Sequence, residues 1–191
     1  GGHAKVVIAT ARACGWEVAA AYDDDPELNG ARVLGVPVRG ALTDAPAGAP
    51  AVLALGRNAS RERAARRFSM EWVALVHPAA VVHDSVALGP GAVVFAGAVV
   101  QPDSRLGGHT IVNTGATIDH ECRVGAFCHV APGAHLAGGV VLEEGVFVGL
   151  GAGVVNGVTL GAWSTLGAGG VAIRDIGPRT TAVGVPAKVV S

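Results

Sequence analysis

The chain has 191 residues, a net charge of −1 and a pI near 6.7, so its charge gives no reason to expect nucleic acid or an anionic membrane as a partner. Half of its residues are hydrophobic, only 4% are aromatic and 29 are glycine, which favours a core of small aliphatic side chains in a narrow, regular cross-section. Three irregularly spaced cysteines form neither a disulfide framework nor a zinc motif. With no apolar run of membrane-spanning length and no signal peptide, we expect a cytoplasmic protein.

Residues 1–74 predict a small α/β unit. Residues 3–14 have helical spacing and end at a glycine, which is a typical helix stop. Residues 17–22 and 51–55 are short apolar runs typical of buried strands, and residues 57–68 predict an exposed basic helix. The alternation of strand and helix is typical of a Rossmann-like parallel sheet.

Residues 75–191 are dominated by a six-residue repeat. Counted in sixes from Val76, sixteen successive positions are Val, Leu or Ile without a break: Val76, Val82, Leu88, Val94, Val100, Leu106, Val112, Ile118, Val124, Val130, Leu136, Leu142, Val148, Val154, Leu160 and Leu166. This period fits neither an α-helix nor a flat sheet, but it fits a triangular solenoid in which each face uses one hexad. Three hexads make a coil, so the repeat predicts a parallel β-helix of a little over five coils, stacked about 4.8 Å apart.

A second set of positions shares the same period. Two residues before the aliphatic position lie small or β-branched residues: Ala92, Ala98, Ser104, Thr110, Ala116, Cys122, Cys128, Ala134, Val140 and Val146. We expect the aliphatic residues to fill the interior and the small residues to lie beside them near the corners. The two cysteines of the repeat are then buried filler, which disfavours a covalent acyl-enzyme.

Five segments carry a resemblance to a known family: GGHAKVV at 1–7, DDDP at 23–26, LVHPAAVV at 75–82, NTGATIDHECRVG at 113–125 and GVPAK at 184–188. In this order they resemble the sialic acid O-acetyltransferase family, which includes bacterial N-acetyltransferases acting on UDP-linked (bacillosamine-type) and GDP-linked (perosamine-type) amino sugars. The resemblance implies a left-handed β-helix, acetyl-CoA as co-substrate without a metal, and a homotrimer with sites shared between neighbouring solenoids. Family members usually carry a β-strand ahead of the Gly-Gly-His, which is the one departure.

His120 is the strongest candidate for the base that acyl transfer to an amine or hydroxyl requires. It follows the inward Ile118 by two residues, so its ring should point outward, and one coil later Gly138 would lie above it. A residue without a side chain there leaves room for a pantetheine arm. Glu121 could orient the imidazole, and the resemblance likewise implies a catalytic histidine followed by glutamate. We expect direct attack on acetyl-CoA, with N–H groups near Gly138 and Gly149 stabilising the oxyanion.

The resemblance also implies two binding sites. For the nucleotide sugar the residues are His3, in a glycine turn ahead of the first helix, Asp23, and the outward-pointing Asn113. For acetyl-CoA they are His129, Gly138, Gly149, Leu150 and Ala168, with His129 facing the catalytic histidine of a neighbouring chain. The remaining histidines are predicted to be structural or on the surface: His77, His83, His109 and His135.

Other functions stay open at this point. A γ-type carbonic anhydrase has the same solenoid with three zinc-binding histidines, but no His-x4-His pair occurs in this solenoid. A non-catalytic sugar-binding scaffold would need no base. Within the enzymes, N-acetylation of a nucleotide-linked amino-dideoxy sugar for a surface glycan is favoured by the α/β unit. O-acetylation of sialic acid or another sugar is the alternative, since a His-Glu pair serves both amines and hydroxyls.

Overall fold

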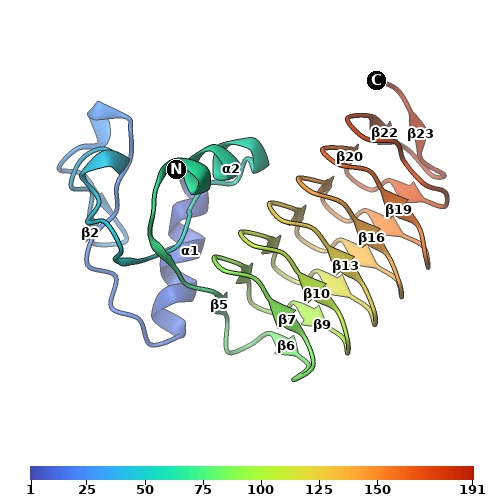
Figure 1. Cartoon of the computed structure of the whole chain (residues 1–191), viewed down its shortest axis with the longest axis horizontal. Coiled ribbons are helices and arrows are strands. Elements are labelled where there is room, and N and C mark those ends of the chain that lie inside the picture. Colours follow the sequence, from blue (N-terminus) through green and yellow to red (C-terminus); the bar gives the residue numbers. More distant parts are fainter.

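The computed structural model describes residues 1–191, which form an α/β unit beside a triangular solenoid (Figure 1). The α/β unit has two helices, two single-turn 3-10 helices and four short strands: α1 (Gly2–Ala13), η1 (Pro26–Leu28), β1 (Arg32–Val33), β2 (Val36–Pro37), η2 (Leu42–Asp44), β3 (Pro50–Ala51), α2 (Asn58–Arg67) and β4 (Glu71–Trp72). Strands β1 and β2 pair antiparallel, whereas β3 and β4 pair parallel. Neither helix combines the length and apolarity needed to cross a bilayer.

The strands of this unit are shorter than the sequence predicts. Residues 17–22 form no strand, and Ala21 makes only an isolated parallel bridge with Val38. The strand predicted over 51–55 is reduced to β3. An apolar run becomes a strand only where a neighbouring segment pairs along it, and here the partners cover few residues.

The two predicted helices are present, with one correction to each. The helix predicted over 3–14 begins at Gly2, with Gly1 as its N-cap, so the glycine turn ahead of it is confined to the first residue. The helix predicted over 57–68 is α2, but it is not exposed throughout. Arg61 is 1% exposed because this side of α2 packs on the solenoid.

Three parallel sheets form the faces of the solenoid. The first face comprises β5 (Leu75–Val76), β8 (Val93–Val94), β11 (Ile111–Val112), β14 (His129–Val130), β17 (Phe147–Val148), β20 (Thr165–Leu166) and β22 (Thr181–Val183), with β23 (Lys188–Val189) antiparallel at its end. The second face comprises β6 (Val81–Val82), β9 (Val99–Val100), β12 (Thr117–Ile118), β15 (His135–Leu136), β18 (Gly153–Val154) and β21 (Val171–Ala172). The third face comprises β7 (Ala87–Leu88), β10 (Arg105–Leu106), β13 (Arg123–Val124), β16 (Val141–Leu142) and β19 (Thr159–Leu160).

The register confirms the eighteen-residue coil, since Val94, Val112 and Val130 lie opposite one another on successive rungs. The solenoid is longer than the six-residue ladder predicts, because the first face has seven parallel rungs, from β5 to β22. The last coil holds the stack with sixteen residues instead of eighteen, as the pairings of Leu160 with Ile176 and Leu166 with Ala182 show.

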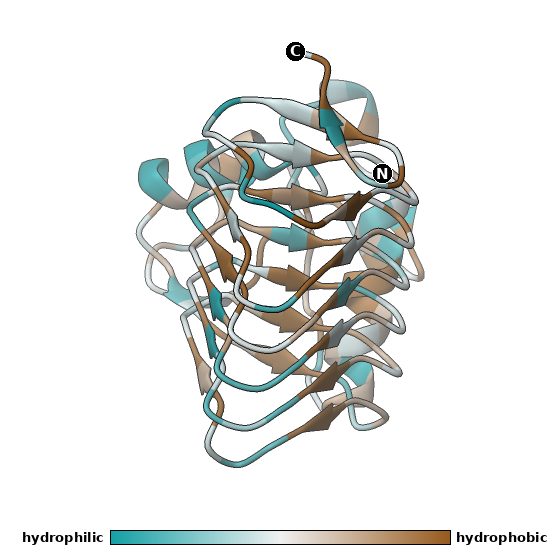
Figure 2. Ribbon diagram, turned by 90° about the vertical axis from the view of Figure 1, so that its right-hand side faces the viewer, coloured by the Kyte–Doolittle hydropathy of each residue, from teal (hydrophilic) through white to brown (hydrophobic).

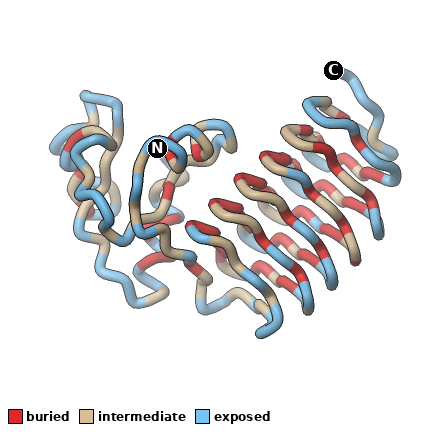
Figure 3. Tube along the Cα trace, viewed as in Figure 1, coloured by how far each residue is buried: buried red, intermediate tan, exposed pale blue.

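The predicted interior forms the main hydrophobic core, a cluster of 25 buried residues. Both repeating sets contribute to it, and Cys122 and Cys128 lie in the small-residue set at 0% exposure. Apolar and buried residues follow the strands from coil to coil (Figures 2 and 3). A second, smaller core joins Val7 and Ala11 of α1 to Leu75 and Val93 of the first face. The α/β unit is thereby held against the first face.

Candidate active site

His120 lies at the corner between the second and third faces, in the turn that follows β12. Its backbone N–H donates to Asp119 Oδ1 at 2.8 Å, and its ring Nδ1 lies 3.1 Å from Glu121 Oε2. Glu121 adopts a left-handed backbone conformation, φ 58°, and its N–H donates to the Pro102 carbonyl of the coil before. A carboxylate can only accept a hydrogen bond, so Nδ1 carries the proton and Nε2 has a free lone pair. Glu121 therefore lies where it can orient the His120 ring, and Nε2 is free to accept a proton.

Gly138 lies over the His120 ring at the same corner of the next coil. A Cβ built on Gly138 would come within 2.5 Å of Cε1 and 2.6 Å of Nε2 of this ring. The Gly139 N–H donates to the His120 carbonyl at 2.9 Å, whereas the Gly138 N–H has no acceptor. The corner thus offers one free backbone donor, on the residue against which the His120 ring packs.

The backbone N–H of Gly149 does not serve as the predicted second donor. It already donates to the Leu166 carbonyl at 2.8 Å in the ladder between coils. Ala168 follows one coil later, and its N–H has no acceptor in the chain. Leu150 is 60% exposed beside it. Leu150 and Ala168 are therefore exposed at this corner, where Ala168 supplies the free donor, whereas Gly149 is buried.

These residues lie on two different corners of the solenoid. His120 and Gly138 follow strands of the second face, whereas Gly149 and Ala168 follow strands of the first face. The two corners are separated by the width of the second face, on the order of 15 Å. A single chain therefore brings only Gly138 of the predicted acetyl-CoA residues to His120, and Gly149, Leu150 and Ala168 lie at the other corner.

A third group of predicted residues meets where the α/β unit covers the first face. His129 is 8% exposed; its Nε2 lies 2.9 Å from Asn113 Nδ2, and its Nδ1 lies 3.2 Å from the Gly56 carbonyl oxygen. The His3 ring lies 6.3 Å from the His129 ring between centroids. Burial, followed by the charge of Arg61, lowers the pKa of His129 to about 4, and the same two causes lower the pKa of His3. The structure joins His3, Asn113 and His129 in one cluster, in which His129 is buried and the other two are half-buried.

Asp23 lies elsewhere, in a turn where its Oδ1 accepts a hydrogen bond from the backbone N–H of Asp25 at 3.1 Å. It lines a cavity of about 350 Å³ together with Arg63 and Arg67 of α2. His3 and Asn113 do not line this cavity. The structure therefore separates the three residues assigned to the nucleotide sugar into two places.

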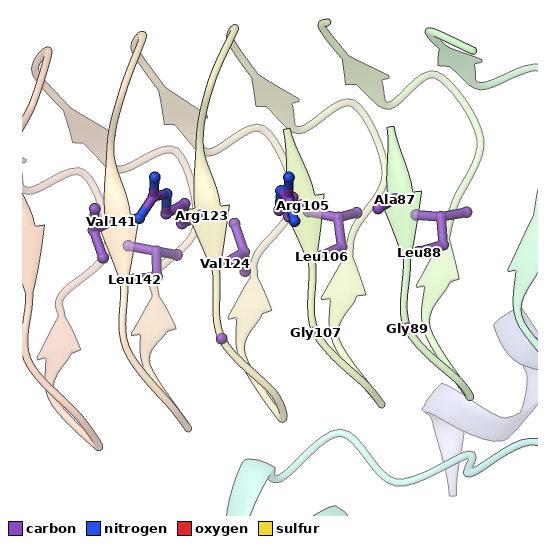
Figure 4. Close-up of a pocket in the computed structure, with 11 residues that line it drawn as sticks. Ala87, Leu88, Gly89, Arg105, Leu106, Gly107, Arg123, Val124, Val141 and Leu142 are labelled. Carbon is purple, nitrogen blue, oxygen red and sulfur yellow. The ribbon is translucent and has the colours of Figure 1, made fainter. Parts of the chain in front are cut away.

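A groove with a volume of about 460 Å³ lies on the third face (Figure 4). Arg105 and Arg123 stand on adjacent rungs above an apolar floor that includes Leu106 and Val124. None of the predicted site residues lines it.

The two cysteines of the solenoid are buried thiols. Cys122 Sγ donates to the Ala137 carbonyl at 3.2 Å, and Cys128 Sγ donates to the Glu143 carbonyl at 2.9 Å. Burial raises the pKa of both thiols, that of Cys128 to about 12. Neither thiol is placed or ionised as a nucleophile needs.

Arg61 is the buried residue that the sequence did not reveal. Burial lowers the pKa of its guanidinium to about 10. Its neighbours along α2 are charged and mostly exposed, so the basic pattern of this helix hides it. The histidines predicted to be structural or on the surface agree with the structure, with His109 buried and the other three at least partly exposed.

Comparison with known proteins decides the family. Residues 1–68 match the family described as the PglD N-terminal domain. The whole chain superposes on PerB from Caulobacter crescentus, solved with CoA and GDP-perosamine, with 46% identity and a TM-score of 0.92 over 100% of this chain and 94% of that one. This chain belongs to the bacterial hexapeptide-repeat sugar N-acetyltransferases. The predicted resemblance and fold class are thereby confirmed.

Other relatives agree with this family. The acetyltransferase domain of PglB from Neisseria gonorrhoeae FA1090, solved with acetyl coenzyme A, is 37% identical with a TM-score of 0.93, over 100% of this chain and 95% of that one. WeeI from Acinetobacter baumannii AYE, at 22% identity and a TM-score of 0.85, shares the fold over 96% of this chain and 93% of its own. The serine acetyltransferase of Escherichia coli strain K12 is 41% identical over 49 residues, 26% of this chain. That match spans 18% of the serine acetyltransferase.

Proposed function

We propose that this sugar N-acetyltransferase moves the acetyl group of acetyl-CoA to the amine of a nucleotide-linked amino-dideoxy sugar used in a surface glycan. The observation that carries the proposal is the exposed His120 ring, which packs against Gly138, a residue with no side chain and a free N–H. A thioester bound at this exposed corner would lie near both a basic nitrogen and a hydrogen-bond donor.

The chemistry follows from these groups. Nε2 of His120 removes a proton from the sugar amine as the amine nitrogen attacks the thioester carbonyl carbon and the C–N bond forms. The Gly138 N–H stabilises the resulting oxyanion. The C–S bond then breaks, and the thiolate of CoA receives the proton from Nε2. Glu121 stabilises the imidazolium that exists between the two proton transfers.

We assign the two ligands to different parts of the chain. Residues 1–74 and Asn113 hold the nucleotide sugar, with His3 and Asp23 as contacts. Residues 75–191 hold acetyl-CoA, with its pantetheine arm along Leu150 and Ala168 and its thioester near Gly138. The GDP-perosamine in PerB supports a GDP-linked sugar, and a UDP-linked sugar is the alternative. Both ligands are cytoplasmic metabolites, which supports a cytoplasmic enzyme.

The active unit that we propose is a homotrimer. The corner that carries His120 and the corner that carries Ala168 flank the same face of one solenoid. If the second faces of three chains turn toward a common axis, each His120 corner meets the other corner of a neighbour. The first-face strands that precede Asn113 and carry His129 end at this corner of the neighbour.

The proposal is tested by following the release of the CoA thiol from acetyl-CoA with a panel of acceptors. The panel contains GDP- and UDP-linked 4-amino-dideoxy sugars, their 4-hydroxy counterparts and free sialic acid. We expect turnover with at least one amino sugar nucleotide and a product that carries an amide. Turnover with sialic acid or the hydroxy sugars alone would contradict N-acetylation.

A further inference from the structure

Arg61 is a buried cation without a carboxylate partner. Inside the α/β unit its Nη1 donates to the carbonyls of Leu55 at 3.0 Å and Gly56 at 2.9 Å, and its Nη2 donates to Asn58 Oδ1 at 2.9 Å. Removing a guanidinium from water costs several kcal/mol, and carbonyl dipoles return only part of this. A residue that serves only to pack α2 could be apolar, so the charge calls for another explanation.

The same side chain ties α2 to the solenoid. Its Nε donates to the His109 carbonyl at 3.0 Å, and its Nη2 donates to the carbonyls of Phe127 at 2.8 Å and Cys128 at 3.1 Å. Asn58 extends the contact by donating to the Gly145 carbonyl at 3.0 Å. His109, Phe127 and Gly145 hold the same corner position on three successive coils, so the two side chains fix α2 in register with the solenoid.

The Gly56 carbonyl connects Arg61 to His129. It accepts a hydrogen bond from Arg61 Nη1 at 2.9 Å and lies 3.2 Å from His129 Nδ1. A carbonyl oxygen has no proton to give, so Nδ1 of His129 must be the protonated nitrogen. Nε2 of the neutral ring is then an acceptor, and the Asn113 amide lies 2.9 Å away with its NH2 group toward it.

The orientation of Asn113 follows from this chain of bonds. Its NH2 group gives one hydrogen to His129, and its Oδ1 accepts from the Thr114 N–H at 2.8 Å. One amide hydrogen and one oxygen lone pair are left for a ligand. A sugar hydroxyl, which can donate and accept at once, fits this pair of positions.

We infer that Arg61 is a positioning residue for sugar binding: by holding the Gly56 carbonyl against His129, it fixes the His129 tautomer and through it the orientation of the Asn113 amide. The inference rests on the proposed role of Asn113 at the sugar. Arg61, which lies outside the proposed ligand sites, thereby determines which way the Asn113 amide faces.

The charges around His129 act in the same direction. Arg61 on α2 and His3 on α1 are the charged or titratable groups that face it, and both disfavour a proton on Nε2. Cys128 precedes it in the chain and is un-ionised, because burial raises the pKa of its thiol. A protonated His129 would donate from Nε2 and could no longer accept from Asn113. The guanidinium of Arg61 therefore helps to keep Nε2 of His129 unprotonated, and able to accept from Asn113, at the pH of the cell.

The tautomer is measured directly by nitrogen NMR of histidine-labelled protein, with the His129 signals assigned from a His129→Gln variant. In the wild type we expect the proton on Nδ1 and no titration between about pH 5.5 and pH 8. In Arg61→Met we expect the tautomer to become mixed and the pKa of His129 to rise, while burial still holds it below its ordinary value. The KM for the nucleotide sugar should rise about tenfold or more, and kcat and the KM for acetyl-CoA should change little.

Three variants separate positioning from folding. Arg66→Met makes the same change at an exposed position of α2 and should alter neither the tautomer nor the KM for the sugar. Asn58→Ala removes the bonds to the coil at Gly145 and should lower the melting temperature while His129 keeps its tautomer. Arg61→Lys keeps a charge that can donate to the Gly56 carbonyl, so it should retain the tautomer and most of the sugar affinity.

A proton on Nε2 of His129 in the wild type would overturn the inference. So would an Arg61→Met protein that melts at a lower temperature but keeps both the tautomer and the KM for the sugar. If Arg61→Met does not fold, the inference is tested by the His129 tautomer of the wild type and of Arg61→Lys, both of which should carry the proton on Nδ1. The tautomer measurements need no turnover, so they stay valid even if the acceptor panel shows that the proposed function is wrong.

Discussion

Gly138 lies directly above the ring of His120, so close that a Cβ on the glycine would come within 2.5 Å of the imidazole Cε1. The two residues are eighteen positions apart and occupy the same corner on successive coils. The site that we propose therefore depends on a side chain that is absent as much as on one that is present.

Gly138→Ala should reduce activity without unfolding the protein. The backbone of Gly138 is not in the left-handed region, and the Cβ would meet only the ring of His120, an exposed side chain that can turn away. We expect a loss of about 10- to 100-fold in kcat/KM, because the base leaves its position beside the thioester. The melting temperature should change by no more than about 2 °C.

Gly177→Ala is the matched control for this change. A Cβ on Gly177 would make only an ordinary contact, 3.9 Å from Thr180 Cγ2. Its kinetic constants should equal those of the wild type. Equal activity of the Gly138→Ala and Gly177→Ala proteins would show that the position of the His120 ring against Gly138 does not matter for activity.

Cys122→Ala and Cys128→Ala should keep kcat, because both thiols are buried and un-ionised. Each loses a sulfur from the core, which should cost about 1 kcal/mol or more of stability. Urea unfolding and steady-state kinetics measure the two effects separately. An acetylated peptide containing either cysteine, trapped by rapid acid quench and found by mass spectrometry, would contradict direct transfer.

The buried histidines should make the fold less stable as the pH falls. The pKa of His129 is lowered to about 4 in the folded chain, mainly by burial and then by Arg61, and the pKa values of His3 and His109 are lowered for the same reasons. Below the ordinary pKa of 6.5 the unfolded chain therefore binds more protons than the folded one. Stability is fully present above this value and is lost toward pH 4.

For His129 alone the expected loss between pH 7 and pH 5 is about 2 kcal/mol. It is measured by urea unfolding of the wild type and His129→Gln across this range. The variant should show a shallower pH dependence. Equal slopes for the two proteins would contradict a neutral, buried His129.

The solenoid could be predicted in detail from the sequence because each coil repeats the same requirement. Every sixth residue must fill the interior. The sixteen repeat positions from Val76 to Leu166 therefore identify the faces, the corners and the outward direction of His120. The last coil was not predicted, because it has sixteen residues instead of eighteen and therefore breaks the six-residue spacing. Its Ile176 and Ala182 pair with the coil before.

The contacts between the two units could not be read in this way. Arg61 looks like its exposed neighbours on α2, and only the packing of that helix on three coils shows that it is buried. The failure of Gly149 as a donor has a similar cause, since its N–H is used by Leu166 of the next coil. The spacing of residues in the sequence does not show which backbone N–H groups are already hydrogen-bonded to the next coil.

Two inactive variants should restore each other if the active sites are shared between chains. His120→Asn removes the base, and Asn113→Ala removes the proposed contact to the sugar, on different faces of the solenoid. If the two variants assemble at random in equal amounts, about a quarter of all sites would combine an intact His120 corner with an intact Asn113 from the neighbour. Activity of the co-expressed mixture no higher than that of the two variants purified separately would contradict a shared site.

The most direct test of the account is the kinetics of His120→Asn with acetyl-CoA and the best amino sugar nucleotide of the panel. We predict that kcat falls by about a thousandfold, within the usual range for loss of a general base, while both ligands still bind with near wild-type affinity by calorimetry. The chain should keep its melting temperature, because the His120 ring is exposed. A His120→Asn protein that retains more than about a tenth of the wild-type kcat would contradict the assignment of the base.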